Sequence, residues 1–121
     1  MTHSENVVSN KFFSTISALT KDGALSWSRL TPESYRWFED VNAEKSFQAD
    51  YKGGTIFLLL DEETEVAVCQ IIPASGLSPV PFGESGDSTL TRLYEQIRAA
   101  MPTPLESYIN AVLSENSRPM F

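Results

Sequence analysis

The chain is poor in the residue types that most catalytic sites, metal sites and disulfide-bonded domains use. It has a single cysteine, Cys69, and a single histidine, His3, among 121 residues. One cysteine excludes an intrachain disulfide, and its place in the apolar run EVAVCQII predicts a small buried hydrophobe instead of a reactive thiol. Because His3 lies in a terminal segment, we expect neither a histidine-based catalytic triad nor a zinc site.

Positive charge and long hydrophobic runs are also scarce. Nine lysines and arginines face sixteen acidic residues, which gives a net charge of −7 and a pI near 4.6. A net negative charge repels the phosphate backbone of nucleic acids, and the basic residues are scattered along the sequence. We therefore expect no nucleic-acid partner. No window approaches the roughly 18 apolar residues of a membrane span, and the first residues lack a signal-peptide pattern. The sequence therefore predicts a cytoplasmic protein without membrane contact.

The remaining composition is that of a globular domain with one core. Hydrophobic residues make up 41% and charged residues 21% of the chain, which argues against disorder. Apolar residues at helical spacing predict an N-terminal helix, and alternating or continuous apolar runs predict strands. The expected positions are about 5–20 for the helix and 24–30, 46–52, 55–60 and 66–72 for the strands.

Two more helices are predicted after the last strand. Asp87 or Ser88 can cap the first of them. The second begins at a capping box made by Thr103 and Glu106, with Pro104 at the first helical position. Each helix carries an apolar stripe: Leu90, Leu93, Tyr94, Ile97 and Met101 on the first, and Leu105, Tyr108, Ile109, Val112 and Leu113 on the second.

The order of these elements predicts an α+β fold in one domain, residues 1–121. An N-terminal helix precedes a four-stranded antiparallel β-meander, and two C-terminal helices pack on the sheet. Residues 1–4 and 115–121 are expected to fray. The segment 73–87 holds three prolines and three glycines and predicts a long loop, either functional or mobile.

The segment DEETE places four acids between two strands that are expected to pair. The simplest interpretation is a solvated hairpin turn, in which Asp61, Glu62, Glu63 and Glu65 keep the loop hydrated and discourage association through strand edges. A cation site is an alternative, although the glycine and the ligand spacing of a calcium loop are missing. The other alternative is an acidic contact surface for a basic partner.

Aromatic side chains provide a second group of candidate binding residues. Tyr35, Trp37 and Phe38 lie among charged residues in the segment 31–45, which Thr31-Pro32-Glu33 could open with a short helix. Such aromatics most often form a lid over the core, and the alternative is an exposed contact patch. Phe82, in the long loop, is a further candidate binding residue.

Three spaced segments resemble those of small bacterial proteins that prophages and mobile elements often encode. The segments are LTKDGALSW, FQADYKGGTIFLLL and LTRLYEQIRAAMPTPLESYINAVL. The resemblance covers most of the chain except the segment 31–45 and the proline-rich loop. It implies a fold and a mobile-element setting, and it brings no catalytic residues.

A protein-binding module is the function that these features predict. We expect no enzyme, cofactor or metal, and a protein partner of basic character that an inhibitor or immunity protein of this kind would neutralise. One alternative is a small-ligand protein of the nucleotide-binding type, in which the loop 73–87 closes over a pocket and Arg92 and Arg98 meet phosphates. A homodimer is the other alternative.

Overall fold

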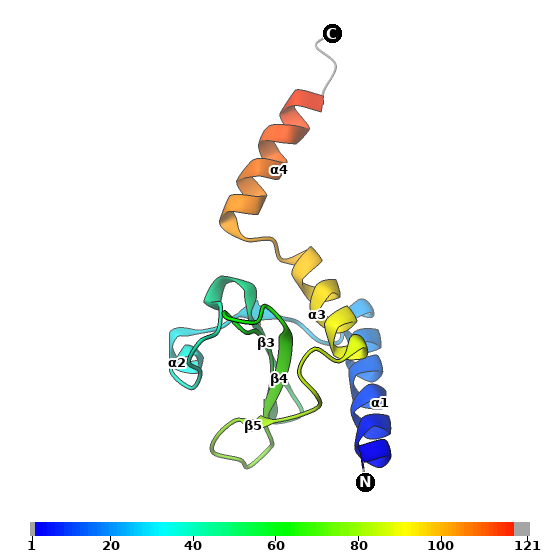
Figure 1. Cartoon of the computed structure of the whole chain (residues 1–121). Coiled ribbons are helices and arrows are strands. Elements are labelled where there is room, and N and C mark those ends of the chain that lie inside the picture. Colours follow the sequence, from blue (N-terminus) through cyan, green and yellow to red (C-terminus); the bar gives the residue numbers. More distant parts are fainter. Residues whose placement is uncertain (1, 118–121) are drawn as a thin grey trace.

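The computed structural model describes the backbone of residues 2–117 and the side chains of residues 7–115 (Figure 1). The fold is α+β, as predicted from the sequence. The helices are α1 (Thr2–Lys21), α2 (Pro32–Tyr35), α3 (Ser88–Ala100) and α4 (Pro104–Ser117), with a 3₁₀ turn η1 (Ala43–Lys45). The strands are β1 (Ser28–Arg29), β2 (Phe47–Tyr51), β3 (Gly54–Leu60), β4 (Ala67–Ile72) and β5 (Val80–Pro81).

The strands form one antiparallel sheet in the order β1-β2-β3-β4-β5, which is the predicted meander with one strand added. The added strand, β5, is a two-residue pairing with β4 inside the segment that was expected to be a loop. The first predicted strand shortens to β1. The alternating apolar residues of 24–30 mark a buried segment more than a paired strand. Leu25 lies in the core, but only Ser28 and Arg29 pair with β2.

The β2–β3 hairpin turns one residue before the gap at 53–54 that separates the predicted strands 46–52 and 55–60. Lys52 and Gly53 are the two central residues, with φ of 51° and 83°, and Tyr51 pairs with Gly54. Positive φ at both positions suits the twist of a two-residue hairpin. Gly54 is needed for a different reason, since a Cβ there would meet the carbonyl oxygen of Ile72 at 2.7 Å.

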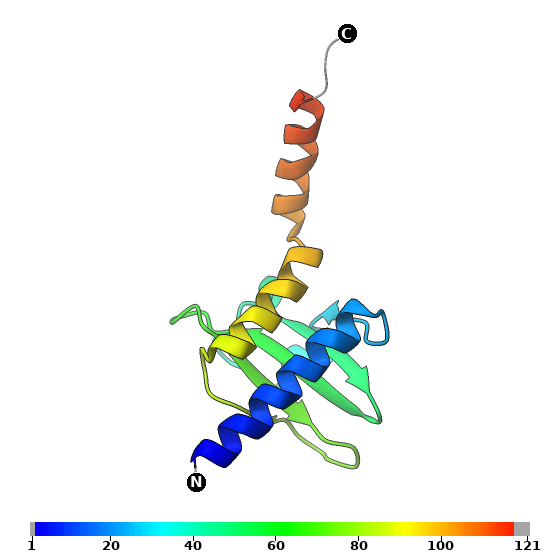
Figure 2. The same cartoon turned by 90° about the vertical axis from the view of Figure 1, so that its right-hand side faces the viewer.

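The central strand β3 is buried on both faces, and each face has its own cover. Ile56 and Leu58 point toward α1 and α3, which cross one side of the sheet (Figure 2). Core side chains from both helices, such as Phe13 and Leu93, fill this layer. The apolar stripe predicted for α3 is confirmed, since Leu90, Leu93, Tyr94 and Ile97 are all buried.

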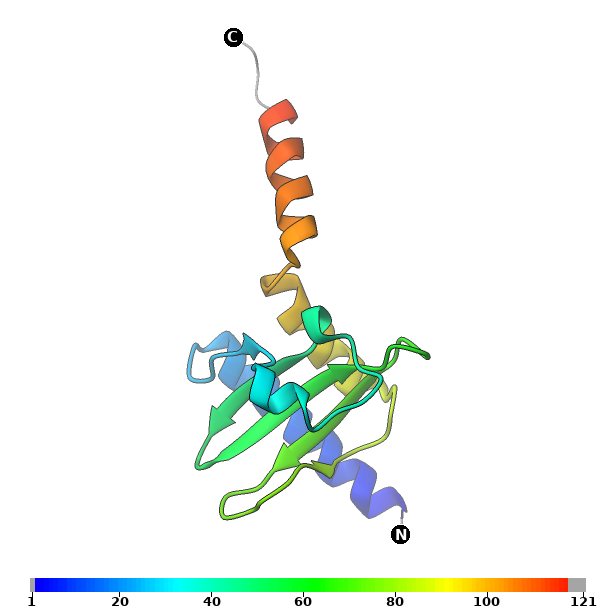
Figure 3. The ribbon, with the colours of Figure 1, turned by 90° about the vertical axis from the view of Figure 1, so that its left-hand side faces the viewer.

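The segment 30–45 covers the opposite face of the sheet, as Figure 3 shows with α2 in front of the strands. Phe38 and Val41 from this segment pack on Phe57 and Leu59 of β3. The short helix α2 starts where the sequence predicted, with the Thr31 side chain accepting a hydrogen bond from the backbone of the third residue of the helix. The lid is therefore part of the core.

The last helix, α4, does not pack on the sheet, contrary to the prediction. It projects away from the sheet and from α3 (Figure 1). The capping box itself is confirmed: Thr103 Oγ1 accepts from the Glu106 amide at 3.2 Å, and Glu106 Oε1 accepts from the Thr103 amide at 2.9 Å. Both faces of the sheet are already covered by α1, α3 and the lid, so the apolar stripe of α4 has no sheet face to meet.

Helical structure also extends into the two segments expected to fray. The helix α1 begins at Thr2, and α4 continues through Ser117. Residue 1 and residues 118–121, which belong to the predicted frayed ends, lie outside the described residues. Among the described helices, none has the length and apolar composition that crossing a bilayer would require.

Ser46 links the lid to the end of the central strand. Its side chain is fully buried. The hydroxyl donates to the carbonyl oxygen of Asn42 at 2.7 Å and accepts from the amide of Leu60 at 3.0 Å. These bonds join η1 to the last residue of β3, directly before the acidic turn.

Replacing Ser46 by alanine should destabilise the fold by about 1–3 kcal/mol, because the amide of Leu60 loses its bond to the Ser46 hydroxyl and the carbonyl oxygen of Asn42 keeps only the bond from the Lys45 amide. Urea unfolding should show a lower midpoint with an unchanged m-value. Ser26→Ala, at an exposed serine, is the matched control and should leave the midpoint in place. Equal midpoints for the two variants would contradict this role of Ser46.

Candidate functional site

The acidic turn between β3 and β4 is organised by its first residue. Asp61 Oδ1 accepts from the amides of Glu63 and Thr64, both at 2.9 Å. Its carbonyl oxygen accepts from the amide of Glu65, which has a φ of 57°. Asp61 is thus committed to holding the turn, while the side chains of Glu62, Glu63 and Glu65 are exposed to solvent.

Accepting these amides also lowers the pKa of the Asp61 carboxyl. The backbone bond from Thr64 is the largest cause, and the bond from Glu63 acts in the same direction. The carboxylate therefore stays ionised at neutral pH.

The predicted aromatic residues of the lid divide into one buried ring and two exposed ones. Phe38 is 7% exposed and packs edge-on against Phe57, with ring centroids 5.0 Å apart. Tyr35 and Trp37 are 43% and 51% exposed. Both interpretations of the segment thus hold at different positions: Phe38 closes the core, and Tyr35 and Trp37 remain on the surface.

Backbone contacts bring the lid and the acidic turn together. Val41 forms an isolated bridge with Asp61, and the amide of Glu62 donates to the carbonyl oxygen of Asp40 at 2.7 Å. Next to Val41, the amide of Asn42 donates to the carbonyl oxygen of Leu60 at 2.9 Å. Two candidate groups about twenty-five residues apart in the sequence therefore lie side by side.

A hollow of about 360 Å³ lies where these groups meet, on the side of the sheet away from α1 and α3. Trp37, Phe38, Glu39 and Asp61 line it from one side, and β4 and residues around Ser85 line it from the other. We call the exposed residues here the acidic–aromatic surface. It comprises the exposed residues Trp37, Glu39, Asp40, Glu62, Glu63 and Glu65, together with the half-buried Asp61.

Two of the predicted binding residues lie apart from this hollow. Tyr35 is exposed on α2 and is not among the residues lining it. Phe82 packs on the side of α1, with its ring centroid 4.9 Å from that of Phe12 and 5.7 Å from that of Phe13. The role that the structure gives Phe82 is to hold the start of the segment after β5 against α1.

A second surface, which the sequence predicts to pack on the sheet, is the exposed apolar side of α4. Its residues are 44–69% exposed. Their spacing places them on one side of the helix. We call this set the α4 face: Leu105, Tyr108, Ile109, Val112 and Leu113. The signal in the sequence was the break Pro102-Thr103-Pro104, since the residue before each proline favours an extended conformation and the helical path is interrupted there.

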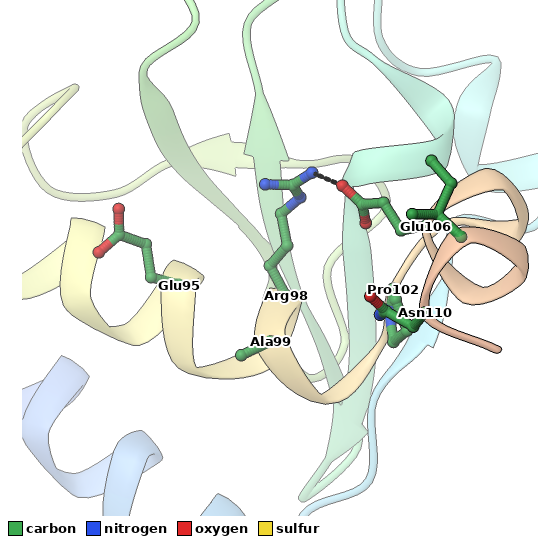
Figure 4. A pocket seen from close by; sticks show the side chains of 7 residues that line it. Glu95, Arg98, Ala99, Pro102, Glu106 and Asn110 are labelled. Carbon is green, nitrogen blue, oxygen red and sulfur yellow. Dashed lines mark hydrogen bonds and ion pairs between the residues drawn. The ribbon is translucent and has the colours of Figure 1, made fainter. Parts of the chain in front are cut away.

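The base of α4 is held by two arginines. Arg98 of α3 donates through Nη2 to Glu106 Oε2 at 2.6 Å, which Figure 4 shows at the junction of the two helices. Arg29 of β1 donates through Nη2 to the carbonyl oxygens of Met101, at 3.5 Å, and Pro102. Arg98 therefore contacts α4 itself, and Arg29 contacts the connection that precedes it.

The α3–α4 junction also forms a hollow, of about 460 Å³. Arg98 and Glu106 lie across it from each other, and Ala99, Pro102 and Ile109 supply apolar lining (Figure 4). The backbone bond from Thr103 and the neighbouring Arg98 lower the pKa of the Glu106 carboxyl. The carboxylate is therefore ionised where it meets the guanidinium.

The arginines of the nucleotide-type alternative are apart from each other. Arg98 is engaged by Glu106, while Arg92 lies with Lys21 in a groove between α1 and α3. The space between the sheet and the helices, where a pocket under the loop was expected, is filled by the core. The loop itself carries β5, and its Leu77 is 91% exposed.

Groups that could support covalent or metal chemistry are few. Cys69 borders the first hollow but is 3% exposed, and burial raises the pKa of its thiol to about 12. Nucleophilic chemistry requires the thiolate, which is negligible at neutral pH with such a pKa. Among the described residues, no three histidine, cysteine or acidic side chains converge in a metal-binding arrangement.

The Asp61 carboxyl should titrate below its usual value of 3.8 in a carboxyl-carbon NMR titration. Because the folded pKa is the lower one, the turn stabilises the folded state above about pH 4, and this contribution is lost as the pH falls through the folded pKa. Asp61→Asn retains an oxygen acceptor but should abolish this pH dependence. A midpoint at or above 3.8 would contradict the described hydrogen bonding.

The Cys69 thiol of the folded protein should not react with a disulfide reagent at pH 8, because the thiol is buried and its pKa is about 12. In denaturant the thiol is exposed and should react at once. Absorbance of the released thiol reports the reaction. Rapid labelling of the folded protein would show that the hollow gives access to Cys69.

Comparison with known proteins returned no match: no family model fits the chain, and no curated protein and no solved structure shows significant similarity.

Proposed function

We propose that the protein is a non-catalytic binding module that recognises a basic segment of another protein through the acidic–aromatic surface. An inhibitor or immunity protein would act in this way. The observation that carries the proposal is the meeting of Trp37 and Asp61 at one hollow, with the acids of the turn and of the lid around it.

Charge distribution supports a basic partner. The two segments 35–41 and 61–66 hold six of the sixteen acidic residues and a single base, Arg36. Acids concentrated at one place attract a basic partner from a distance and speed its association at low salt. Since Asp61 is bound within the turn, the free carboxylates for this contact are those of Glu39, Asp40 and the three exposed glutamates.

The hollow itself suits a cationic side chain. An arginine or lysine that stacks on the ring of Trp37 would gain a cation–π contact, and the carboxylate of Glu39, which lines the hollow, would accept a charge-assisted hydrogen bond. The volume of about 360 Å³ lies at the low end for ligand sites. This size fits one anchoring side chain of an extended segment better than a whole cofactor.

The proposal is tested with a deca-arginine peptide as the probe, followed by tryptophan fluorescence. We expect saturable binding that weakens with salt, and a fluorescence response that Trp37→Phe abolishes while Trp27, the other tryptophan, still reports the folded state. Reversing Glu62, Glu63 and Glu65 to lysine together should weaken binding by about tenfold or more.

A matched triple variant controls for net charge. Reversing the exposed acids Asp22, Glu44 and Asp50 changes the total charge equally but leaves the acidic–aromatic surface intact, so binding should stay within about threefold of wild type. If both triple variants lost the same binding affinity, the effect would come from net charge alone and not from the acidic–aromatic surface. Unchanged binding after reversal of the turn would refute the surface as the site.

A further inference from the structure

We propose that the α4 face pairs with the α4 face of a second copy of the chain, in an antiparallel, two-fold arrangement. This inference is independent of the proposed function, because it concerns another surface and another partner. It starts from a helix that is anchored at its base by Arg98 and Arg29 but exposes its apolar side. An exposed apolar side of a helix is a surface that another helix can cover.

The size of the α4 face fits a contact between two copies. Side chains of this type, 44–69% exposed, amount to roughly 500 Å² of apolar surface. That area is at the upper end of the largest apolar patch on a typical monomer, about 300–600 Å². It is also more than half of the roughly 800 Å² that each partner contributes to a standard interface.

The hollow at the base of α4 can supply the remainder. A 14-residue helix is about 21 Å long, so the last turn of an antiparallel partner reaches the base of the first helix. There it meets the hollow of about 460 Å³, where Ala99 and Pro102 add apolar lining beside Ile109 of the α4 face. An antiparallel pair thus covers the α4 face and the hollow together, and does so twice by symmetry.

Charge favours a second copy over a basic protein or a membrane as the partner of α4. The helix contains two acids, Glu106 and Glu115, and no lysine or arginine. Glu106 is already paired with Arg98, so a basic partner would find little to bind here. A helix lying on a membrane surface typically carries lysines and arginines on its polar side, and the sequence of α4 has none.

Charge also selects the antiparallel orientation. Each chain has a net charge of −7, and a parallel pair would place two acidic sheets side by side. An antiparallel pair places them at opposite ends of the paired helices. It also brings Glu115 of each copy near the N-terminal end of the partner's α4, where the helix dipole is positive and Arg98 balances the charge of Glu106. Figure 3 shows that the acidic turn and α4 leave the sheet in different directions, so the pairing leaves the acidic–aromatic surface free.

Sedimentation velocity of the full chain from about 5 to about 500 µM tests the pairing, because dimerisation responds to concentration. We expect a monomer–dimer equilibrium whose dissociation constant rises at least about tenfold in Leu113→Glu. Leu77→Glu makes the same change at a leucine that is 91% exposed in the loop and should leave the constant unchanged. A monomer at every concentration, or a dimer that Leu113→Glu does not weaken, would overturn the proposal.

Disulfide trapping tests the orientation separately. Ile109 lies at the middle of the α4 face, so two copies of Ile109→Cys meet near the two-fold axis and should oxidise to a covalent dimer. Cys69 is buried and does not interfere. Leu105→Cys, near one end of the face, and Ser107→Cys, on the other side of the helix, should remain monomeric. Trapping at Leu105 as efficient as at Ile109 would refute the antiparallel arrangement, and trapping at Ser107 would refute the face itself.

Discussion

The rest of the structure depends on the burial of both faces of β3. Ile56 and Leu58 require cover on one side, and Phe57 and Leu59 require it on the other. The helices α1 and α3 meet the first requirement and the lid meets the second. This arrangement draws the lid across the end of the sheet, where its backbone bonds to the start of the acidic turn, and it leaves α4 without a sheet face to cover.

The two surfaces of the molecule follow from this one constraint but differ in chemistry. The acidic–aromatic surface is charged, lies beside the lid and suits a basic segment of another protein. The α4 face is apolar and nearly uncharged, and it suits a copy of itself. A dimer joined through α4 would present two acidic–aromatic surfaces. A partner with two basic segments could bind both surfaces at once, with a higher apparent affinity than either contact gives alone.

Local patterns predicted most of the elements, because the elements are determined locally. The capping box at Thr103, the cap at Asp87, the stripe of α3 and the acidic hairpin all follow from residues close in the sequence. The errors concern relations between distant segments. Packing of α4 on the sheet was predicted from its apolar stripe alone, and a stripe does not specify which surface it will meet.

The sequence predicted the residues of the candidate site but not that they lie together in space. Trp37 and Asp61 were both identified, yet their meeting depends on the bridge of Val41 with Asp61 and on the bond between Glu62 and Asp40, which no periodicity encodes. Phe82 is predicted as a binding residue because an aromatic side chain in a loop resembles a contact residue. Its packing on Phe12 and Phe13 is a long-range relation of the same kind.

Amide hydrogen exchange at high dilution tests most directly whether α1, α3 and the lid alone complete the core. The account predicts strong protection of residues 56–59 in β3, and weak protection of residues 108–113 in α4 that rises when the protein is concentrated. Strong protection of α4 at every dilution would contradict it, because the helix would then be packed against its own chain.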